Sequence, residues 1–196
     1  AGAHETNGYA SHSPVADAQR VYASFGSHGV YALAAATGEV LWSRELGPQR
    51  MRRGWGEGAS PALHGETLLV PADQESGSCL WALDAKSGEP RWKSARDEPS
   101  TWTTPLVVHA GGATQVILNG TNAVRAYDLG SGAELWRCGG QTVNAIPSVV
   151  SDGRRAYAAS GYQGAACYAL RLDRRGDLRA EPDAVLWSHA RGTPYV

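Results

Sequence analysis

The sequence has no run of apolar residues approaching the roughly 20 that a membrane-spanning helix needs. It also has almost no net charge, because 18 Lys and Arg residues face 19 Asp and Glu residues. This balance gives no electrostatic reason to expect nucleic acid or an anionic membrane surface as a partner. Hydrophobic residues make up 42% of the chain and charged residues 19%, a composition typical of a folded globular protein.

Cysteine is scarce and catalytic fingerprints are missing. Cys79, Cys138 and Cys167 lie far apart and have neither CxxC spacing nor metal-ligand spacing with histidine, so we interpret them as small buried strand residues. The sequence contains no Gly-x-Ser-x-Gly, no His-Glu-x-x-His, no P-loop and no dinucleotide fingerprint. The sequence therefore predicts no catalytic residue and no metal-ligand set, and cysteine usage leaves the compartment open.

An internal repeat is the strongest feature of the sequence. Three twelve-residue segments align without a gap: YALAAATGEVLW, WALDAKSGEPRW and RAYDLGSGAELW, which end at Trp42, Trp92 and Trp136. A fourth, degenerate copy begins at Tyr168 and reaches Trp187 after an insertion. The four tryptophans are 50, 44 and 51 residues apart. A second marker keeps the same period, with prolines at Pro14, Pro61, Pro105, Pro147 and Pro194. Two markers in phase indicate a true structural repeat.

Each repeat has the pattern of four short strands. In the first repeat the β-rich runs are 13–16, 20–25, 30–34 and 40–46, and turn-prone residues separate them. Four strands in a repeat of 40 to 50 residues are typical of a β-propeller blade. We therefore predict an all-β propeller of four-stranded antiparallel blades, with about four blades present. The expected blades are 11–47, 58–98, 102–140 and 145–192, and 193–196 resembles the start of another blade. A fragment of a seven- or eight-bladed ring is favoured over four blades that close on themselves.

Glycine precedes tryptophan by four residues in the three full copies of the repeat, and this spacing has a mechanical reason. A glycine in the turn between the third and fourth strands permits a positive φ, and the tryptophan then covers the neighbouring blade. We expect the tryptophans of the full copies to be buried between blades, and we expect Trp187 to lie on an open edge. The predicted docking residues are Gly38, Trp42, Gly88, Trp92, Gly132, Trp136 and Trp187.

The segment 82–92, ALDAKSGEPRW, resembles the tryptophan-docking repeat of the pyrroloquinoline-quinone (PQQ) β-propeller family. The other copies match less fully, because Ala34 replaces the usual acid in the first and Gly130 stands within the turn of the third. The resemblance covers essentially the whole chain, including HETNGYAS, GWGEGASPAL, TVNAIPS and WSHARGTPYV. Together these segments resemble the largely uncharacterised bacterial PQQ-binding-like β-propeller repeat proteins.

The resemblance implies one of two functions. Some members use the repeat as a scaffold or as a module that binds a protein or small ligand. Others are quinoprotein alcohol or sugar dehydrogenases that hold PQQ and calcium over the propeller axis. Quinoprotein alcohol dehydrogenases commonly carry two adjacent cysteines beneath the quinone, whereas no two of the three cysteines in this sequence are adjacent. We therefore expect a scaffold or binding module with no cofactor, and a PQQ- and calcium-dependent dehydrogenase is the alternative. The resemblance also implies a periplasmic or other extracytoplasmic location.

In a propeller the loops that lead into the inner strands surround the mouth of the central tunnel, where ligands bind. Glu57 and Asn144 have oxygen atoms suitable for calcium, although hydrogen bonds within the loops explain such residues equally well. Expected partners are a protein or small molecule at this face, or a second copy at the open blade edges. The candidate ligand-binding residues are His4, Glu5, Asn7, His12, Trp55, Glu57, Trp102 and Asn144.

Several polar loops have simpler interpretations. Asp73 to Glu75 and the pair Arg174 and Arg175 are expected to be solvated turns, and Asn119 fits an Asx turn. The arginines around Met51 form a basic cluster on the connection into the second blade. That cluster either is solvated or receives a phosphate or carboxylate group.

Overall fold

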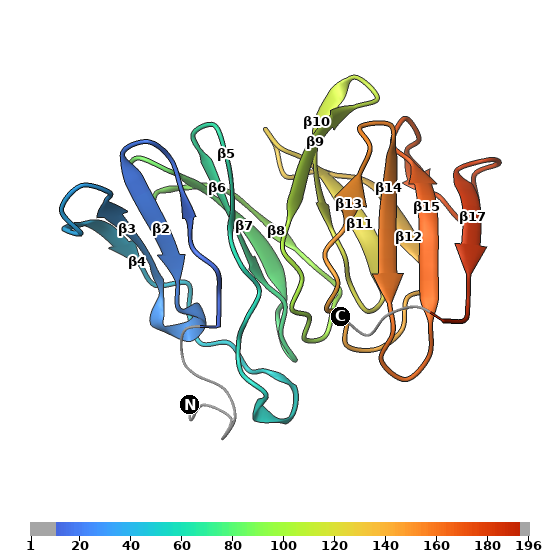
Figure 1. The fold of residues 1–196 in the computed structure, drawn as a ribbon, viewed down its shortest axis with the longest axis horizontal. Coiled ribbons are helices and arrows are strands. Elements are labelled where there is room, and N and C mark those ends of the chain that lie inside the picture. The colour runs from blue at the N-terminus through green and yellow to red at the C-terminus, as the bar shows by residue number, and fades with distance from the viewer. Residues whose placement is uncertain (1–10, 193–196) are drawn as a thin grey trace. The chain divides into compact units, whose positions relative to one another are not determined.

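The computed structural model describes residues 11–192, which form β-sheets in two compact units that divide between Arg96 and Asp97 (Figure 1). Each unit contains two sheets. Among residues 11–192, no helix has both the length and the apolar character needed to cross a membrane.

The first unit contains two sheets of four strands, each in sequence order. The first sheet consists of β1 (Val15–Ala16), β2 (Arg20–Ser24), β3 (Val30–Ala34) and β4 (Val40–Arg44). The second consists of β5 (Ala62–His64), β6 (Thr67–Ala72), β7 (Cys79–Asp84) and β8 (Pro90–Ala95). Two short 3-10 turns, η1 (Gly26–His28) and η2 (Arg52–Gly54), lie in the loops. All neighbouring strands pair antiparallel.

The second unit repeats this design with one addition. The third sheet consists of β9 (Leu106–Ala110), β10 (Ala113–Leu118), β11 (Ala123–Asp128) and β12 (Glu134–Gly139). The fourth consists of β13 (Val150–Ser151), β14 (Arg155–Ser160), β15 (Ala166–Arg171) and β17 (Val185–His189). The additional strand β16 (Gly176–Asp177) pairs with β12 in parallel.

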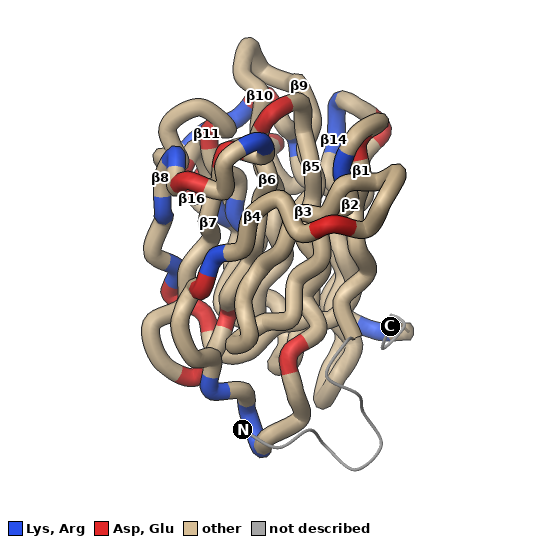
Figure 2. Tube along the Cα trace, turned by 90° about the vertical axis from the view of Figure 1, so that its left-hand side faces the viewer, with Lys and Arg blue, Asp and Glu red and all other residues tan. Residues whose placement is uncertain are grey.

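The predicted fold class is confirmed, because the chain is all-β and its sheets are four-stranded antiparallel meanders of the propeller-blade type. Strands β1–β4, β5–β8 and β9–β12 lie within 11–47, 58–98 and 102–140, and β13–β15 and β17 lie within 145–192. Strand β16 of the third sheet comes from the last of these ranges. Basic and acidic residues are interspersed along the trace, in keeping with the near-zero net charge (Figure 2).

One row of side chains recurs across all four sheets. In each sheet the fourth-strand tryptophan pairs with an alanine on the third strand, and each of these alanines is fully buried. A methyl group leaves room above the sheet for the indole ring, so the small residue and the large one are complementary. The four pairs are Ala32 with Trp42, Ala82 with Trp92, Ala126 with Trp136, and Ala169 with Trp187.

The four tryptophans of this row differ in burial, which corrects the expectation that all three full copies are buried. Trp136 is fully buried in the core of the second unit. Trp42 packs against the core of the first unit but is only partly buried. Trp92 is also partly buried. Trp187, on the last sheet of the second unit, is 42% exposed, in line with the expected open edge.

Gly88 shows why the repeat requires glycine in the turn before the tryptophan. Its φ is +73°, and Gly38 and Gly132 adopt similar values of +74° and +72°. The ring of Trp42 also lies directly over Gly88, so an added Cβ would come within 2.7 Å of that ring. The Trp42 indole N–H donates to the carbonyl oxygen of Ala85 at 3.1 Å, which fixes the ring on the turn of the next sheet.

The insertion in the fourth repeat folds onto the outer edge of the third sheet. Its strand β16 pairs with β12, and Leu178 is fully buried in the core of the second unit. The backbone N–H of Leu178 donates to the carbonyl oxygen of Arg137 at 2.8 Å. The insertion therefore covers an edge strand that would otherwise expose unpaired backbone groups.

Candidate functional site

The meander order gives each sheet two different ends. The loops between its second and third strands, and the connections from one sheet to the next, lie at the end that we call the loop end. The tight turns between the first and second strands and between the third and fourth strands lie at the opposite end, the turn end. Of the candidate ligand-binding residues, His4, Glu5 and Asn7 lie outside the described residues. The others belong to connections at the loop ends of their sheets.

In the first unit, Glu57 joins two loops of the loop end. Its carboxylate accepts hydrogen bonds from the backbone N–H of Ser27 at 2.6 Å and from the Ser27 hydroxyl. Gly26 lies so close that an added Cβ would overlap this carboxylate. The Ser27 hydroxyl also accepts from the backbone N–H of Gln49 at 2.7 Å. Both carboxylate oxygens of Glu57 are therefore engaged in holding the loop at η1.

His12 and Trp55 lie in the same unit, on the connections that lead into its two sheets. His12 is half-buried, and its Nδ1 atom is buried without a hydrogen-bond partner among the described residues. Burial lowers the pKa of His12, while the negative charge of Glu57 acts in the opposite direction. The guanidinium of Arg53 lies 5.6 Å from the centre of the Trp55 ring, within cation–π range. Arg53 is exposed and has a φ of +52°, a strained value for a residue other than glycine.

Asp73 is a buried ion-pair residue, so the expectation of a solvated acidic turn is wrong at this position. Its carboxylate accepts from Arg96 Nε at 2.7 Å and from Arg96 Nη2 at 3.0 Å, and both side chains are completely buried. The bidentate geometry satisfies two of the donors that burial would otherwise leave unpaired. The pair ties the loop after β6 to the segment after β8.

The second unit has a similar buried pair at its loop end. Glu98 accepts from the backbone N–H groups of Asn122 at 2.7 Å and Ala123 at 3.1 Å, and it forms an ion pair with Arg125. Asn119 is fully buried, and its amide donates to the carbonyl oxygens of Pro147 and Ala159, both at 2.9 Å. Its Oδ1 accepts from the N–H of Gly120 at 3.1 Å. This is the next residue along the chain, whereas the bond of an Asx turn comes from the N–H two residues on.

The remaining two candidates lie in the second unit. The backbone N–H of Trp102 donates to the carbonyl oxygen of Ala145 at 3.0 Å, and its side chain is partly buried. Asn144 is only 2% exposed and has a φ of +59°. The structure thus places Trp102 and Asn144 close together in the chain's second unit and His12, Trp55 and Glu57 in its first unit. A ligand-binding role for these residues stays a prediction.

The residues that sequence reasoning missed are the buried acids and their arginines. Nothing in the local sequence separates Asp73 or Glu98 from a solvated acid, because the partner arginine lies more than 20 residues away in each case. The alanine row, by contrast, was visible: Ala32, Ala82 and Ala126 hold the same place in the three aligned segments.

Comparison with known proteins agrees with this fold. The family model described as outer membrane protein assembly factor BamB matches residues 3–190. The structure is similar to that of BamB from Moraxella catarrhalis, with a TM-score of 0.59 and 18% identity over 92% of this chain and 48% of that one. It is also similar to the quinohemoprotein alcohol dehydrogenase from Comamonas testosteroni, with a TM-score of 0.63 and 17% identity over 92% of this chain and 34% of that one.

A europium-containing methanol dehydrogenase gives a TM-score of 0.60 and 15% identity over 93% of this chain and 42% of that one. The chain thus spans about half the length of that BamB and about a third of the Comamonas enzyme. At these identities the structural likeness shows the fold alone, and no curated protein sequence matches the chain. The family model covers nearly all of the sequence, and the chain therefore belongs to the BamB family of PQQ-like β-propeller repeat proteins.

Proposed function

We propose that the chain is a non-catalytic scaffold whose loop end binds another protein in an extracytoplasmic compartment. The family match supports this proposal, because its model is described as an outer membrane protein assembly factor. The observation that carries it is where the backbone strain lies. Four non-glycine residues in the described part of the chain have positive φ, and Arg53, Asn144 and Gln163 among them belong to the loop end. Such strain is concentrated at functional sites more often than elsewhere.

The chemistry of the loop end also fits a protein partner. Arg53 is an exposed cation beside the aromatic ring of Trp55, and arginine and tryptophan are enriched at the centres of protein interfaces. The connection that carries them is held at Glu57, two residues after Trp55, by hydrogen bonds from Ser27. A surface that is already ordered loses less conformational entropy when a partner binds.

The second candidate function is that of a PQQ- and calcium-dependent dehydrogenase, which the likeness to the Comamonas enzyme favours. The donor atoms fit calcium poorly. Calcium takes six to eight oxygen ligands, yet both oxygens of Glu57 accept hydrogen bonds from Ser27. The Asn144 side chain is buried, and the described residues include no group of three or more His, Cys, Asp or Glu side chains placed to hold a metal. We therefore derive no quinone-dependent step for this chain.

Site-specific photo-crosslinking in the source organism tests the scaffold proposal. A photoreactive residue replaces Arg53 at the loop end, and in a matched control it replaces Thr37, which is exposed at the turn end of the same unit. We expect Arg53 to give a discrete crosslinked protein partner and Thr37 to give none. Equal crosslinking from both positions, or none from Arg53 in a folded and abundant chain, would overturn the proposal.

A further inference from the structure

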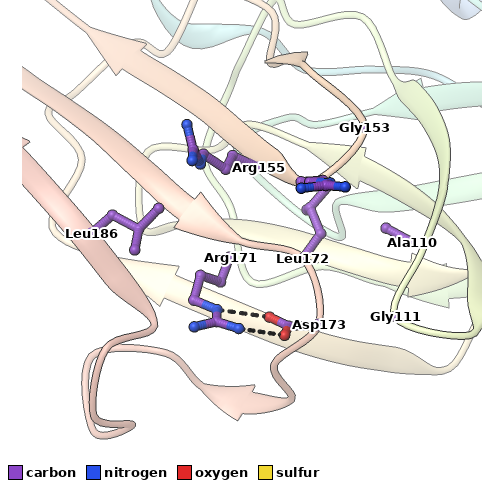
Figure 3. A pocket seen from close by; sticks show the side chains of 9 residues that line it. Ala110, Gly111, Gly153, Arg155, Arg171, Leu172, Asp173 and Leu186 are labelled. Carbon is purple, nitrogen blue, oxygen red and sulfur yellow. Dashed lines mark hydrogen bonds and ion pairs between the residues drawn. The ribbon is translucent and has the colours of Figure 1, made fainter.

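The turn end of the fourth sheet contains a cavity of about 320 Å³ that none of the loop-end residues reaches. This volume is at the lower end of the range for small-molecule sites. Figure 3 shows Arg155, Arg171 and Leu186 extending around it from three neighbouring strands. The residues that line the cavity are Ala110, Gly111, Gly153, Arg154, Arg155, Arg171, Leu172, Asp173 and Leu186.

The lining has an excess of positive charge, with three guanidinium groups and one carboxylate. The Asp173 carboxylate accepts hydrogen bonds from Arg171 Nε at 2.9 Å and from Arg171 Nη2 at 2.6 Å (Figure 3). It therefore balances the charge of one of the three guanidinium groups. Arg155 lies 3.7 Å from Asp152, a contact that is mostly solvated. Arg154 is exposed, and its guanidinium has no carboxylate partner among residues 11–192.

The other three sheets provide an internal comparison for this charge. Arg155 on the second strand of the fourth sheet pairs with Arg171 on its third strand, and the matching pair can be identified from the strand register of each other sheet. The residue just before the second-strand member of each pair corresponds to Arg154. No other sheet has more than one arginine at these three positions, so the fold does not require the three arginines of the fourth sheet. The corresponding residues are Gln19, Arg20 and Ala34 in the first sheet, Glu66, Thr67 and Asp84 in the second, and Thr114, Gln115 and Asp128 in the third.

The walls of the cavity are fixed by hydrogen bonds between neighbouring segments. The Gln115 amide donates to the carbonyl oxygens of Ala110 at 2.9 Å and Leu172 at 2.7 Å. Arg175 Nη2 donates to the carbonyl oxygen of Gly111 at 2.9 Å. Gly111 is so close to the opposite wall that an added Cβ would lie 2.8 Å from the Leu172 oxygen. The site is therefore formed before any ligand binds, which lowers the entropic cost of binding.

We propose that this cavity binds a small organic carboxylate, with the carboxylate group on Arg154 and on the Nη1 atom of Arg171 and a short apolar body against Ala110 and Leu186. The two hydrogen bonds from Arg171 to Asp173 use Nε and Nη2 and do not involve Nη1. The Asp173 carboxylate already illustrates the bidentate geometry that a guanidinium in this cavity offers. The apolar residues of the lining favour a ligand with a hydrocarbon part over a bare inorganic anion. This inference is independent of protein binding at the loop end, because it concerns the opposite end of a sheet.

Calorimetric titration of the purified chain with benzoate and with succinate tests the proposal, and inorganic phosphate serves as the competing anion. Two variants neutralise the site with residues that this chain already has at corresponding positions: Arg154→Gln, as at Gln19, and Arg171→Ala, as at Ala34. A matched control, Arg191→Gln, removes one exposed positive charge beyond the other end of β17. Thermal unfolding of each variant verifies that the fold is retained.

We expect saturable binding of one carboxylate per chain that weakens as the ionic strength rises. Each site variant should lower the affinity about tenfold or more, because each removes a charge-assisted contact, and Arg191→Gln should leave it unchanged. Absence of binding by both carboxylates would overturn the proposal. So would phosphate binding as tight as that of benzoate, or an equal loss of affinity in the Arg191→Gln control.

Discussion

Replacing Trp136 with alanine should destabilise the second unit far more than the same change at Trp187. Both residues pair with an alanine on the third strand of their sheets, and both belong to the second unit. Trp136 is fully buried, whereas Trp187 is 42% exposed. The pair therefore separates the contribution of the ring's burial from the contribution of its position in the repeat.

The expected magnitudes follow from the surroundings of each ring. Truncating a fully buried tryptophan costs about 3–5 kcal/mol through lost transfer energy and the cavity left behind. The Trp136 indole N–H also donates to Gln115 Oε1 at 2.7 Å, and removing it leaves a buried acceptor unpaired at about 1–3 kcal/mol. Together these terms predict a loss of about 4–8 kcal/mol for Trp136→Ala. Trp187→Ala should cost about 1–2 kcal/mol, because the residue is 42% exposed and its removal leaves no closed cavity. The centre of its ring lies 6.1 Å from that of Tyr157 and 5.3 Å from that of His189.

Native-state hydrogen exchange of the backbone amides in β12 and β15 measures both losses on the same unit, without relying on tryptophan fluorescence. The exchange should accelerate for β12 and β15 much more in Trp136→Ala than in Trp187→Ala. Losses that differ by less than about 1 kcal/mol would refute the reasoning that coverage by a following sheet decides what each tryptophan contributes.

Three further predictions follow from single residues. In urea unfolding, Asp73→Asn should lower the free energy of unfolding by about 3–5 kcal/mol, because it leaves the buried Arg96 charge uncompensated. The control Asp173→Asn breaks a solvated ion pair and should cost less than about 1 kcal/mol. Equal costs would contradict the burial argument. The hydrogen bond from Arg91 lowers the pKa of Asp84 to about 2. The stabilisation that ionised Asp84 gives the folded state should therefore be complete above about pH 4 and be lost as the pH falls toward 2. Asp84→Asn should remove this part of the acid sensitivity, and an acid unfolding curve that the variant leaves unchanged would contradict the prediction. Burial raises the pKa of Cys138 to about 11, so at pH 8 iodoacetamide should alkylate it much more slowly than the half-buried Cys167. Mass spectrometry of the alkylated peptides measures the two rates, and faster alkylation of Cys138 would contradict the prediction.

Much of the fold was predictable because its signals are local and periodic. The glycine that precedes each tryptophan in the full copies, and the prolines in phase with it, locate the turns and strands without any knowledge of tertiary contacts. Gly88 shows the limit of this reasoning, because the sequence explains its positive φ but not its second role beneath Trp42, a ring from the previous sheet.

The site was less predictable because burial of a charged residue depends on a distant partner. Asp73 looks like a loop acid until Arg96 is placed beside it, and Arg175 looks like a solvated turn residue until its bond to Gly111 is known. The insertion before Trp187 was visible as extra length, but its pairing with β12 was not, because a two-residue strand carries no pattern of its own.

The proposal that the chain is a scaffold rather than a quinoprotein is tested most directly by titrating the purified chain with PQQ in the presence of calcium. Calorimetry follows binding, and dye-linked alcohol oxidation follows activity in the same samples. The account predicts no saturable heat and no alcohol oxidation, because Glu57 is engaged by Ser27 and Asn144 is buried. Saturable, calcium-dependent binding of PQQ at micromolar or tighter affinity, accompanied by alcohol oxidation, would contradict it.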